Sequence, residues 1–417
     1  MRTERRAAGV AERIRVLIVV QNLSVPLDRR VWLECQALVA AGHRVSVICP
    51  RDEGQPAHRT LDGVRIHTYK PPEARTGVLG YLIEFVYCWL RTAILSLHVA
   101  RHEGFDVLQA CNPPDTYWFL GLLWKAVGRR FVYDQHDLNP EVYVAKFGHE
   151  GPLYRALVLL ERATYAVADH VISTNESYQE TAMRRGHVPL GRTSIVRSAP
   201  DPDRMRAGQP HDGLRNGRAH LVCYLGIMGL QDGVDRLVDA MAHLVHDRGR
   251  DDIQLGLLGF GDCLEDLKAQ VARRRLQPYV TFTGKVGPDE IARWLSTADL
   301  GVTPDPKNAF NDKSTMNKTL EYMAFELPVV GYDLVENRRS AGDAGVYVTE
   351  DSAVALGDAI ADLVDDEPRR ARLGAIGRAR IVDGLRWSAQ VPTYVRVFES
   401  VMGVPAPAAE GSVDACV

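Results

Sequence analysis

Runs of β-branched and aliphatic residues alternate with helical patterns along almost the whole chain of 417 residues. Few architectures accommodate this order, because it predicts parallel strands covered by helices on both faces of a sheet. The sequence therefore indicates the α/β class. Its composition, 46% hydrophobic and 25% charged, is that of a globular chain of about two domains and excludes disordered, collagen-like and coiled-coil proteins.

Thirteen candidate strands follow from this pattern. They are residues 16–20, 45–49, 64–68, 107–110, 131–133, 171–173, 194–197, 221–225, 253–258, 280–283, 300–303, 329–330 and 346–348. After the first strand, Val31, Cys35 and Leu38 share one face of a helix that Gly42 ends.

A polar stretch rich in proline and glycine, residues 199–218, interrupts the pattern and is the best candidate for a linker. It divides the chain into an N-terminal Rossmann-like domain, residues 1–200, and a C-terminal one, residues 201–386. We expect a disordered tail at 403–417. Ligands of such sheets bind beyond the carboxyl ends of the strands, so the strand-to-helix loops are the places to search for a site.

Charge and cysteine content restrict the partners. The formal net charge is −3, so the chain has no basic excess for nucleic acid, and we expect none to bind. Seven scattered cysteines without a Cys-x-x-Cys pair indicate a reducing cytoplasm and no structural zinc. The sequence Asp201-Pro202-Asp203 has the Asp-x-Asp pattern of metal-dependent transferases, but it lies in the linker and fits a turn, so no metal is predicted.

Residues 78–100 form the most apolar segment of the chain. Their hydrophobic residues recur at helical spacing, while Glu84 and Arg91 interrupt a membrane span, so the segment fits an amphipathic helix. Two interpretations stay open. The helix covers a sheet, or it rests on a membrane that carries a lipid-linked acceptor.

Lysine is rare in this chain, with eight lysines against 42 arginines, yet Lys307, Lys313 and Lys318 fall within residues 305–324. We expect Asp312 or Ser314 to cap a helix that begins there. Free N–H groups at a helix start, together with an ammonium group, form a local site for a diphosphate.

Two further readings of this segment stay open. Glu321 could reach the hydroxyls of an attached ribose, and it shares a helix face with Asn317. Alternatively the helix lies on the surface with its lysines solvated, or Lys318 pairs with a carboxylate.

Three motifs in this order resemble a known family. They are Asp134-Gln135-His136-Asp137-Leu138-Asn139-Pro140-Glu141, Asn311-Asp312-Lys313-Ser314-Thr315-Met316, and the helix around Glu321 with Leu327-Pro328-Val329-Val330 after it. Together they resemble family 4 glycosyltransferases of the GT-B fold, in the bacterial branch of surface-polysaccharide transferases. The resemblance implies two Rossmann-like domains that face an interdomain cleft, with a last helix, residues 387–402, crossing back to the first domain.

The resemblance also assigns roles to residues. Glu321 matches the second glutamate of the family's Glu-x7-Glu motif, which holds the donor ribose, whereas Lys313 replaces the first glutamate. Lys313 could take over the diphosphate charge, Asp312 could supply the missing carboxylate, or sugar recognition could differ. His136 would face the donor sugar, and Asp137 would orient its ring. The predicted catalytic residues are His136, Lys313 and Asp312.

The remaining predicted contacts concern donor and acceptor. Ile227 and Asp232 replace an arginine and a lysine that neutralise the diphosphate in many relatives, although glycines remain at this turn. The predicted donor-binding residues are Gly226, Gly229, Lys285, Val286, Lys313, Ser314, Thr315, Met316, Asn317, Lys318 and Glu321. The predicted acceptor-binding residues are Asp28, Arg29, Asn112 and Asp137; Asp28 could instead cap a helix.

These observations predict a cytoplasmic hexosyltransferase, with possible peripheral contact at the inner face of the membrane through residues 78–100. It would move a sugar from a UDP- or GDP-sugar to a polysaccharide or lipid-linked intermediate or to a small natural product, with retention of configuration and without a cofactor. Two rival functions stay open: a nucleotide-sugar epimerase of the same fold and a non-catalytic sugar-binding subunit.

Overall fold

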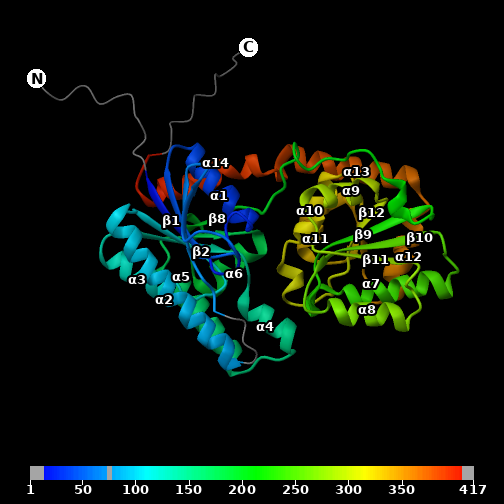
Figure 1. Cartoon of the computed structure of the whole chain (residues 1–417), viewed down its shortest axis with the longest axis horizontal. Helices are drawn as coiled ribbons and strands as arrows, with labels where there is room; N and C mark the ends of the chain where they lie inside the picture. The colour runs from blue at the N-terminus through cyan, green and yellow to red at the C-terminus, as the bar shows by residue number, and fades with distance from the viewer. Residues whose placement is uncertain (1–13, 73–77, 406–417) are drawn as a thin grey trace, which may run out of the picture. The chain divides into compact units, whose positions relative to one another are not determined.

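The computed structural model describes residues 14–72 and 78–405 (Figure 1). Contacts divide them into two compact units, which we describe separately. The first unit contains the chain up to Asn139, Arg155–Val196 and the chain from Val391 on. The second unit contains Pro140–Tyr154 and Arg197–Gln390.

The first unit is built on an eight-stranded sheet of order β3-β4-β2-β1-β5-β6-β7-β8. Only the β3–β4 pair is antiparallel among the paired strands that the structure describes. The strands are β1 (Arg15–Val19), β2 (Arg44–Pro50), β3 (His58–Leu61), β4 (Val64–Tyr69), β5 (Val107–Cys111), β6 (Arg130–Gln135), β7 (His170–Ser173) and β8 (Thr193–Ile195).

Helices cover both faces of this sheet. They are α1 (Arg29–Ala40), α2 (Val78–His102), α3 (Trp118–Ala126), α5 (Pro152–Val167), α6 (Glu176–Gly186) and the end of α14 (Trp387–Val401). Leu95 of α2, Leu120 of α3 and Tyr165 of α5 pack with the sheet residues Leu108 and Phe131 in one core. On α1, Val31, Cys35 and Leu38 are fully buried, as their spacing predicts.

The second unit is built on a six-stranded, all-parallel sheet of order β11-β10-β9-β12-β13-β14. The strands are β9 (His220–Ile227), β10 (Ile253–Phe260), β11 (Val280–Gly284), β12 (Leu300–Thr303), β13 (Val329–Tyr332) and β14 (Gly345–Val348). In chain order this is the 3-2-1-4-5-6 arrangement of a dinucleotide-binding sheet, whose switch point lies between β9 and β12.

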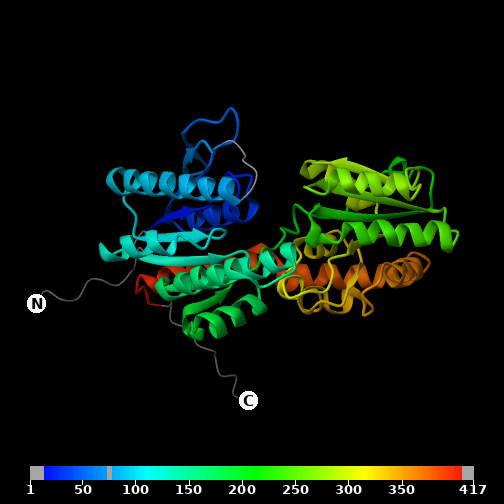
Figure 2. The same ribbon diagram turned by 90° about the horizontal axis from the view of Figure 1, so that it is seen from below.

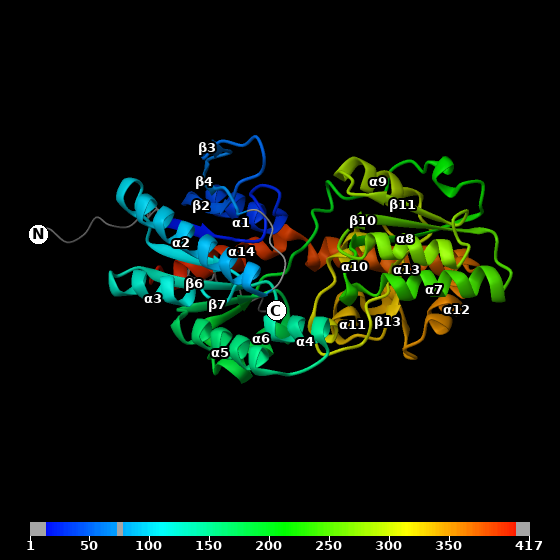
Figure 3. The same cartoon turned by 60° about the horizontal axis from the view of Figure 1, so that its bottom comes forward.

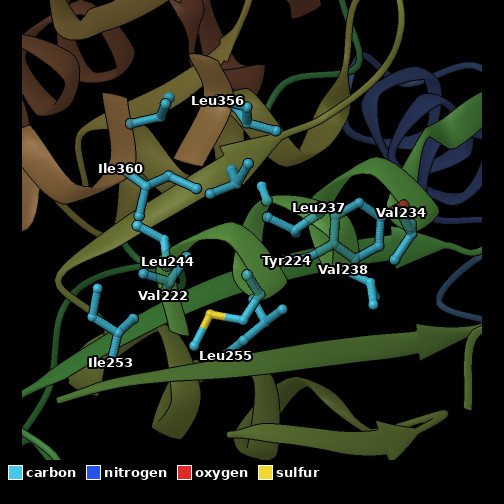
Figure 4. Packing of buried hydrophobic residues seen from close by; sticks show 14 of the residues in the cluster. Val222, Tyr224, Val234, Leu237, Val238, Leu244, Ile253, Leu255, Leu356 and Ile360 are labelled. Carbon is cyan, nitrogen blue, oxygen red and sulfur yellow. The ribbon is translucent and has the colours of Figure 1, made fainter. Parts of the chain in front are cut away.

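Helices again form a layer on each face, as Figure 1 shows for the second unit. They are α7 (Val234–Ala242), α8 (Leu264–Arg273), α9 (Pro288–Thr297), α10 (Asn317–Ala324), α11 (Val335–Ala341), α12 (Ala353–Val364) and α13 (Glu367–Arg380). Helix α4 (Asn139–Phe147) clusters with this unit from Pro140 on. Figure 4 shows one core, where Leu237 of α7 and Ile360 of α12 pack with the sheet residues Val222, Tyr224 and Leu255.

All thirteen predicted strands are present, and the pattern missed only β3 among the described strands. This edge strand has the sequence His-Arg-Thr-Leu and is partly exposed, so it lacks the apolar run by which the others are recognised. Its antiparallel pairing also departs from the purely parallel sheet that we expected.

Helix α2 appears in Figure 2 as the long cyan helix on the outer side of its unit. Its segment Ile83–His102 is long and apolar enough to cross a membrane. In an apolar stretch of 18 residues of this segment, 22% is buried. A buried helix of a soluble protein meets the same criterion, so length and composition do not decide between a core helix and a membrane contact.

The contact units and the predicted domains share most of their residues, and they differ mainly in one segment. Residues 140–154 precede the predicted linker, yet they cluster with the second unit, where Glu141 contacts Lys313. The last helix, α14, begins in the second unit, and its residues from Val391 on cluster with the first. Most of the predicted tail at 403–417 lies outside the described residues.

Candidate active site

The turn after β9 lies at the switch point of the second sheet. Gly226 and Gly233 have φ angles of 155° and 65°, which other residues rarely adopt. A Cβ atom on Gly233 would lie 2.2 Å from the carbonyl oxygen of Pro304, beyond the end of β12. Two strand-to-helix loops therefore meet in backbone contact, as a site for a diphosphate requires.

Lys318 of α10 lies beside this turn. Its side chain is 8% exposed, and its Nζ atom lies 2.8 and 3.0 Å from the two carboxylate oxygens of Asp305. Nζ also lies 4.9 Å from the centre of the Tyr224 ring. Burial lowers the pKa of Lys318, but the charges of Asp305 and Asp232 outweigh it and raise the pKa overall. Lys318 is thus a buried, fixed cation, and the alternative that it pairs with a carboxylate is confirmed.

Asp232 is the second acidic group at the turn. It accepts a hydrogen bond of 2.9 Å from the Gly229 backbone N–H. Burial raises the pKa of Asp232 to about 6, with Asp305 adding to the rise and Lys318 opposing it. The position where the family resemblance implies a lysine thus carries a carboxyl group that changes its charge at mildly acidic pH.

Lys313 forms an ion pair that the sequence did not reveal. Its Nζ atom lies 3.0 Å from Oε1 of Glu141 on α4, and the Glu141 side chain is 7% exposed. Asp312 accepts a 3.0 Å hydrogen bond from the Val335 backbone N–H instead of facing its own helix. A carboxylate therefore does meet position 313, but it comes from Glu141.

Our prediction that Asp312 or Ser314 caps the helix is wrong. Helix α10 begins at Asn317 after Met316, whose side chain makes no capping bond. The Ser314 hydroxyl instead donates to the Phe310 carbonyl oxygen at 2.9 Å, within the preceding loop. The turn between Phe310 and Ser314, Asn311–Lys313, is a 3-10 helix.

The other donor-site candidates of this segment differ in burial. Asn317 is exposed, whereas Glu321, one turn further along α10, is 8% exposed. Met316 is buried, and Thr315 lies 3.4 Å from a carboxylate oxygen of the buried Glu336. The reading that these lysines are merely solvated does not hold, since even the exposed Lys307 donates to the Asp333 carbonyl oxygen at 3.0 Å.

An apolar rim lines the carboxyl ends of β9 and β10. Ile227, Leu230 and Phe260 are 44 to 73% exposed there. The predicted donor residue Lys285 places its Nζ atom 5.4 Å from the centre of the Phe260 ring, and Val286 follows it in the loop after β11. A planar apolar group fits such a rim.

A separate polar network surrounds His136 at the end of β6 in the first unit. Its Nε2 atom lies 2.7 Å from Oδ2 of Asp134 and 3.1 Å from Nε of Arg30. The backbone N–H of His136 donates to Asn112 at 2.6 Å. Burial opposes a charged ring, but Asp134 outweighs it and raises the pKa of His136. Asp134 is thus the carboxylate that contacts the ring, where we expected Asp137.

Arg30 and Asp134 form the buried centre of this network. Their salt bridge is 2.8 Å long, and Glu34 lies 3.0 Å from Arg30. Burial and the neighbouring Asp134 raise the pKa of Glu34. The pKa of Asp134 is lowered, because Arg30 and His136 outweigh its burial. The pairing of Arg30 with Asp134 could not be predicted, because these residues are 104 positions apart in the chain.

The predicted acceptor residues lie around the first sheet's switch point. Asp28 accepts from the Val31 N–H at 3.1 Å, so it caps α1, while Arg29 is exposed. The amide of Asn112 is buried, donating to the Asp137 carbonyl at 2.8 Å and accepting from the Asp137 N–H at 3.1 Å. The Asn112 side chain is thus bound to the backbone of the loop that holds His136 and Asp137.

Comparison with known proteins finds two family matches. Residues 27–198 match the family "Glycosyl transferase 4-like domain", and residues 219–366 match "Glycosyl transferases group 1". The chain is 26% identical over 370 residues to a GDP-mannose-dependent alpha-(1-6)-phosphatidylinositol monomannoside mannosyltransferase of Mycobacterium tuberculosis, covering 76% of this chain and 92% of the relative.

Two solved structures share the fold. Sucrose-phosphate synthase from Thermosynechococcus elongatus superposes with a TM-score of 0.73 at 19% identity, over 94% of this chain and 100% of the other. Anabaena HepE in complex with UDP and glucose has a TM-score of 0.69 at 16% identity, with the same coverage. The two family matches, the two Rossmann-like sheets and these neighbours show that the chain belongs to the family 4 glycosyltransferases of the GT-B fold.

Proposed function

We propose that this glycosyltransferase transfers a hexosyl group from a UDP- or GDP-sugar to an acceptor with retention of anomeric configuration. The observation that carries the donor assignment is Lys318, a buried ammonium group held by Asp305 beside the glycine turn at the switch point of the second sheet. The M. tuberculosis relative is named for GDP-mannose, and a fold neighbour was solved with UDP and glucose, which supports this donor class.

The chemistry that we propose is stabilisation of the leaving group. Breaking the anomeric bond places negative charge on the diphosphate, and fixed cations and N–H dipoles lower that barrier. Lys318 and the backbone of the turn at Gly226 and Gly229 would provide them, while Glu321 would hold the ribose. Lys313 would add charge if the diphosphate draws it away from Glu141.

The apolar rim suits the nucleobase of the donor. Phe260 with Lys285 at 5.4 Å offers an aromatic face and a cation to a nucleobase. The neighbouring Ile227 extends this apolar surface. Uracil and guanine both fit this surface, so the proposed donor is either a UDP-sugar or a GDP-sugar.

In the first unit, His136 would assist transfer at the sugar. Its raised pKa favours a protonated ring, which donates to a sugar hydroxyl or to the leaving phosphate. Asp134 holds the ring through a contact of 2.7 Å. Arg29 and the loop shaped by Asn112, with Asp137, are the proposed acceptor contacts.

We propose that transfer needs no cofactor. Cys111, Asp134 and His136 place possible ligand atoms within 4.8 Å of one another. The Arg30 guanidinium, however, contacts both Asp134 and His136, at 2.8 and 3.1 Å. Burial also raises the pKa of Cys111 well above its usual value, so the thiolate that binds metals is disfavoured.

We further propose that the acceptor is lipid-linked and that the enzyme works in the cytoplasm at the inner face of the membrane. On α2, Val86, Leu90, Ile94 and Leu97 are 45 to 56% exposed, although this helix also packs on the sheet. The relative named above is named for a phosphatidylinositol monomannoside, a lipid.

Helix α3 enlarges this apolar surface. Phe119, Leu122, Leu123 and Val127 are 45 to 63% exposed, and the Phe119 ring stacks on Trp89 of α2 at 5.8 Å. Exposed apolar patches of this kind are rare on proteins that contact only water. Arg91 and Arg101 of α2 would meet anionic head groups.

A donor panel tests the function. The protein is incubated with UDP- and GDP-sugars, with and without a lipid extract as acceptor, while free nucleotide and sugar isomers are measured. We expect nucleotide release only with acceptor. An isomerised donor without release would instead establish an epimerase, and donor binding without either reaction would establish a sugar-binding subunit.

A further inference from the structure

The last helix, α14, places a polar group in the core of the first unit. Tyr394, Val397 and Phe398 recur at the i, i+3 and i+4 spacing of one helix face, and all three are buried. Helix α14 is drawn in red in Figure 3. Of these three side chains, only Tyr394 carries a polar atom, and its hydroxyl donates to Oε1 of Gln109 on β5 at 2.7 Å.

Gln109 connects Tyr394 to two carboxylates. Its Nε2 atom donates to Oε2 of Glu34 at 2.8 Å and to Oδ2 of Asp134 at 3.1 Å. Gln109, Glu34 and Asp134 are all fully buried. The same oxygen of Asp134 lies 2.7 Å from Nε2 of His136. A continuous chain of contacts therefore runs from the Tyr394 hydroxyl through Gln109 and Asp134 to the His136 ring.

The amide of Gln109 has one favourable orientation at this position. A side-chain amide presents N–H donors on its nitrogen and an acceptor on its carbonyl oxygen. Asp134 pairs with Arg30 at 2.8 Å, so it is an anion that only accepts hydrogen bonds, and the amide nitrogen must face it. The carbonyl oxygen then faces Tyr394, whose hydroxyl satisfies it. The Tyr394 hydroxyl thus fixes the orientation of the amide.

The amide in turn determines where Oδ2 of Asp134 points. Arg30 holds the other oxygen, Oδ1, but a carboxylate held at one oxygen can still rotate about its Cβ–Cγ bond. If the amide turned over, its carbonyl oxygen would face Oδ2, and the two oxygens would repel each other. The carboxylate would then rotate, and the His136 ring would lose the contact that fixes it.

Stability alone does not explain this arrangement. A buried polar side chain must replace its hydrogen bonds to water, which costs free energy. Replacing both partners of a buried hydrogen bond with apolar groups of similar shape can be nearly neutral, so phenylalanine at 394 and leucine at 109 would fill the core as well. The feature that such a pair would lack is the hold on Asp134 and, through it, on His136.

We propose that Tyr394 and Gln109 are positioning residues for sugar transfer and hold the His136 ring in one orientation through Asp134. This inference rests on the proposed role of His136 at the donor sugar. Both residues act through Asp134 and need no contact with a substrate. The last helix of the chain thus contributes to the polar network at the end of β6.

NMR of the whole chain tests the orientation of the ring directly. The Cε1–H signals of histidine-labelled protein are recorded, and the signal that His136→Gln lacks identifies His136. We expect one sharp His136 signal in the wild type and a broadened or split signal in both Tyr394→Phe and Gln109→Leu. Several His136 signals in the wild type, or an unchanged single signal in Tyr394→Phe, would overturn the proposal. An unchanged signal in Gln109→Leu would do the same.

Phe398→Leu is the matched control. Phe398 is fully buried one turn beyond Tyr394 on α14, with the ring centres 5.1 Å apart, and its side chain has no polar atom. This variant should lose stability in a thermal melt but keep the His136 signal of the wild type. If Phe398→Leu alters that signal as much as Tyr394→Phe does, the effect is a general loosening of the core, and the proposal fails.

Transfer rates show whether the orientation of the ring matters for the reaction. Tyr394→Phe should lower kcat about 10- to 100-fold, as expected from a displaced catalytic group, and leave the KM of the donor within about twofold. Because Tyr394 acts through Gln109, adding Tyr394→Phe to Gln109→Leu should lower kcat no further. Additive losses would contradict the connection through Gln109.

The two measurements separate this inference from the proposed function. If the wild type transfers no sugar, the proposed role of His136 fails, while the NMR signals still decide whether Tyr394 and Gln109 hold the ring. A wild-type kcat in Tyr394→Phe would remove the positioning role and leave the proposed function standing.

Discussion

Glu141 Oε1 lies 3.0 Å from Lys313 Nζ, so the position where the family resemblance implies a glutamate holds a lysine paired with a glutamate of another helix. Glu141 lies on α4, which clusters with the second unit although it precedes the linker. Position 313 therefore carries a positive charge instead of a negative one, and the carboxylate of Glu141 neutralises it. A diphosphate must compete with Glu141 for Lys313.

This competition gives the first prediction. Lys313→Ala should weaken binding of UDP or GDP by about 1–3 kcal/mol, the size of a lost charge-assisted contact. Glu141→Gln should instead strengthen it, because the ammonium group is released for the diphosphate. Calorimetry on both variants and on the double variant measures the coupling, and unchanged affinity in Lys313→Ala would remove the phosphate role of Lys313.

Lys318 gives the second prediction. Lys318→Met leaves the buried Asp305 unpaired and should lower the free energy of unfolding by about 3–5 kcal/mol. Adding Asp305→Leu should restore most of the stability, since both charges are then gone, but donor binding should stay lost. Lys307→Met, at the exposed lysine of the loop that precedes α10, is the matched control and should change neither quantity. Donor binding by the restored double variant would contradict a phosphate role for Lys318.

Asp232 gives a pH prediction. Because the pKa of Asp232 is raised to about 6, its negative charge disappears as the pH falls through that value. A UDP-sugar, whose diphosphate does not titrate in this range, should therefore bind more tightly at pH 5.5 than at pH 7.5. Asp232→Asn should bind tightly at both values, and a wild-type pH dependence in this variant would show that another group is responsible.

The same carboxyl group affects stability with a defined sign. The folded state holds a proton on Asp232 up to about pH 6, whereas the unfolded state loses it near pH 3.8, so stability falls as the pH rises between these values. Asp232→Asn should thus raise the free energy of unfolding at pH 7.5 by up to about 3 kcal/mol. Urea unfolding at pH 4 and pH 7.5 tests this, with the gain expected only at the higher pH.

The apolar surface of α2 and α3 gives the last prediction. Leu90→Glu/Leu123→Glu should reduce sedimentation with phosphatidylglycerol vesicles at least about fivefold, because both exposed side chains would enter the lipid interface. Leu159→Glu replaces a leucine that is 64% exposed on α5 and is the matched control. Equal vesicle binding by all three proteins would argue against a membrane role for this surface.

Strands were predictable because burial on both faces demands apolar runs, as in Leu221–Leu225, which lies within β9. Strand β3 was not predicted, because a partly exposed edge strand needs no apolar run. The glycine turn at the second switch point was also predictable, since Gly226 and Gly233 take backbone angles that few other residues allow.

The partners of the site residues were not predictable in the same way. Arg30 and Asp134 are 104 residues apart, and Lys313 and Glu141 are 172 apart, so only the folded chain joins them. The predicted helix cap at Asp312 or Ser314 does not form, because both side chains hydrogen-bond to other partners. Asp312 accepts from Val335, and Ser314 donates to Phe310.

The most direct test of sugar transfer follows the anomeric carbon itself. Purified protein is mixed with a UDP- or GDP-sugar and a lipid extract, and the product linkage is read by NMR. The account predicts a glycosylated lipid with the same anomeric configuration as the donor, formed by the wild type and lost in Lys318→Met/Asp305→Leu. An inverted product, or equal product from this stable double variant, would contradict it.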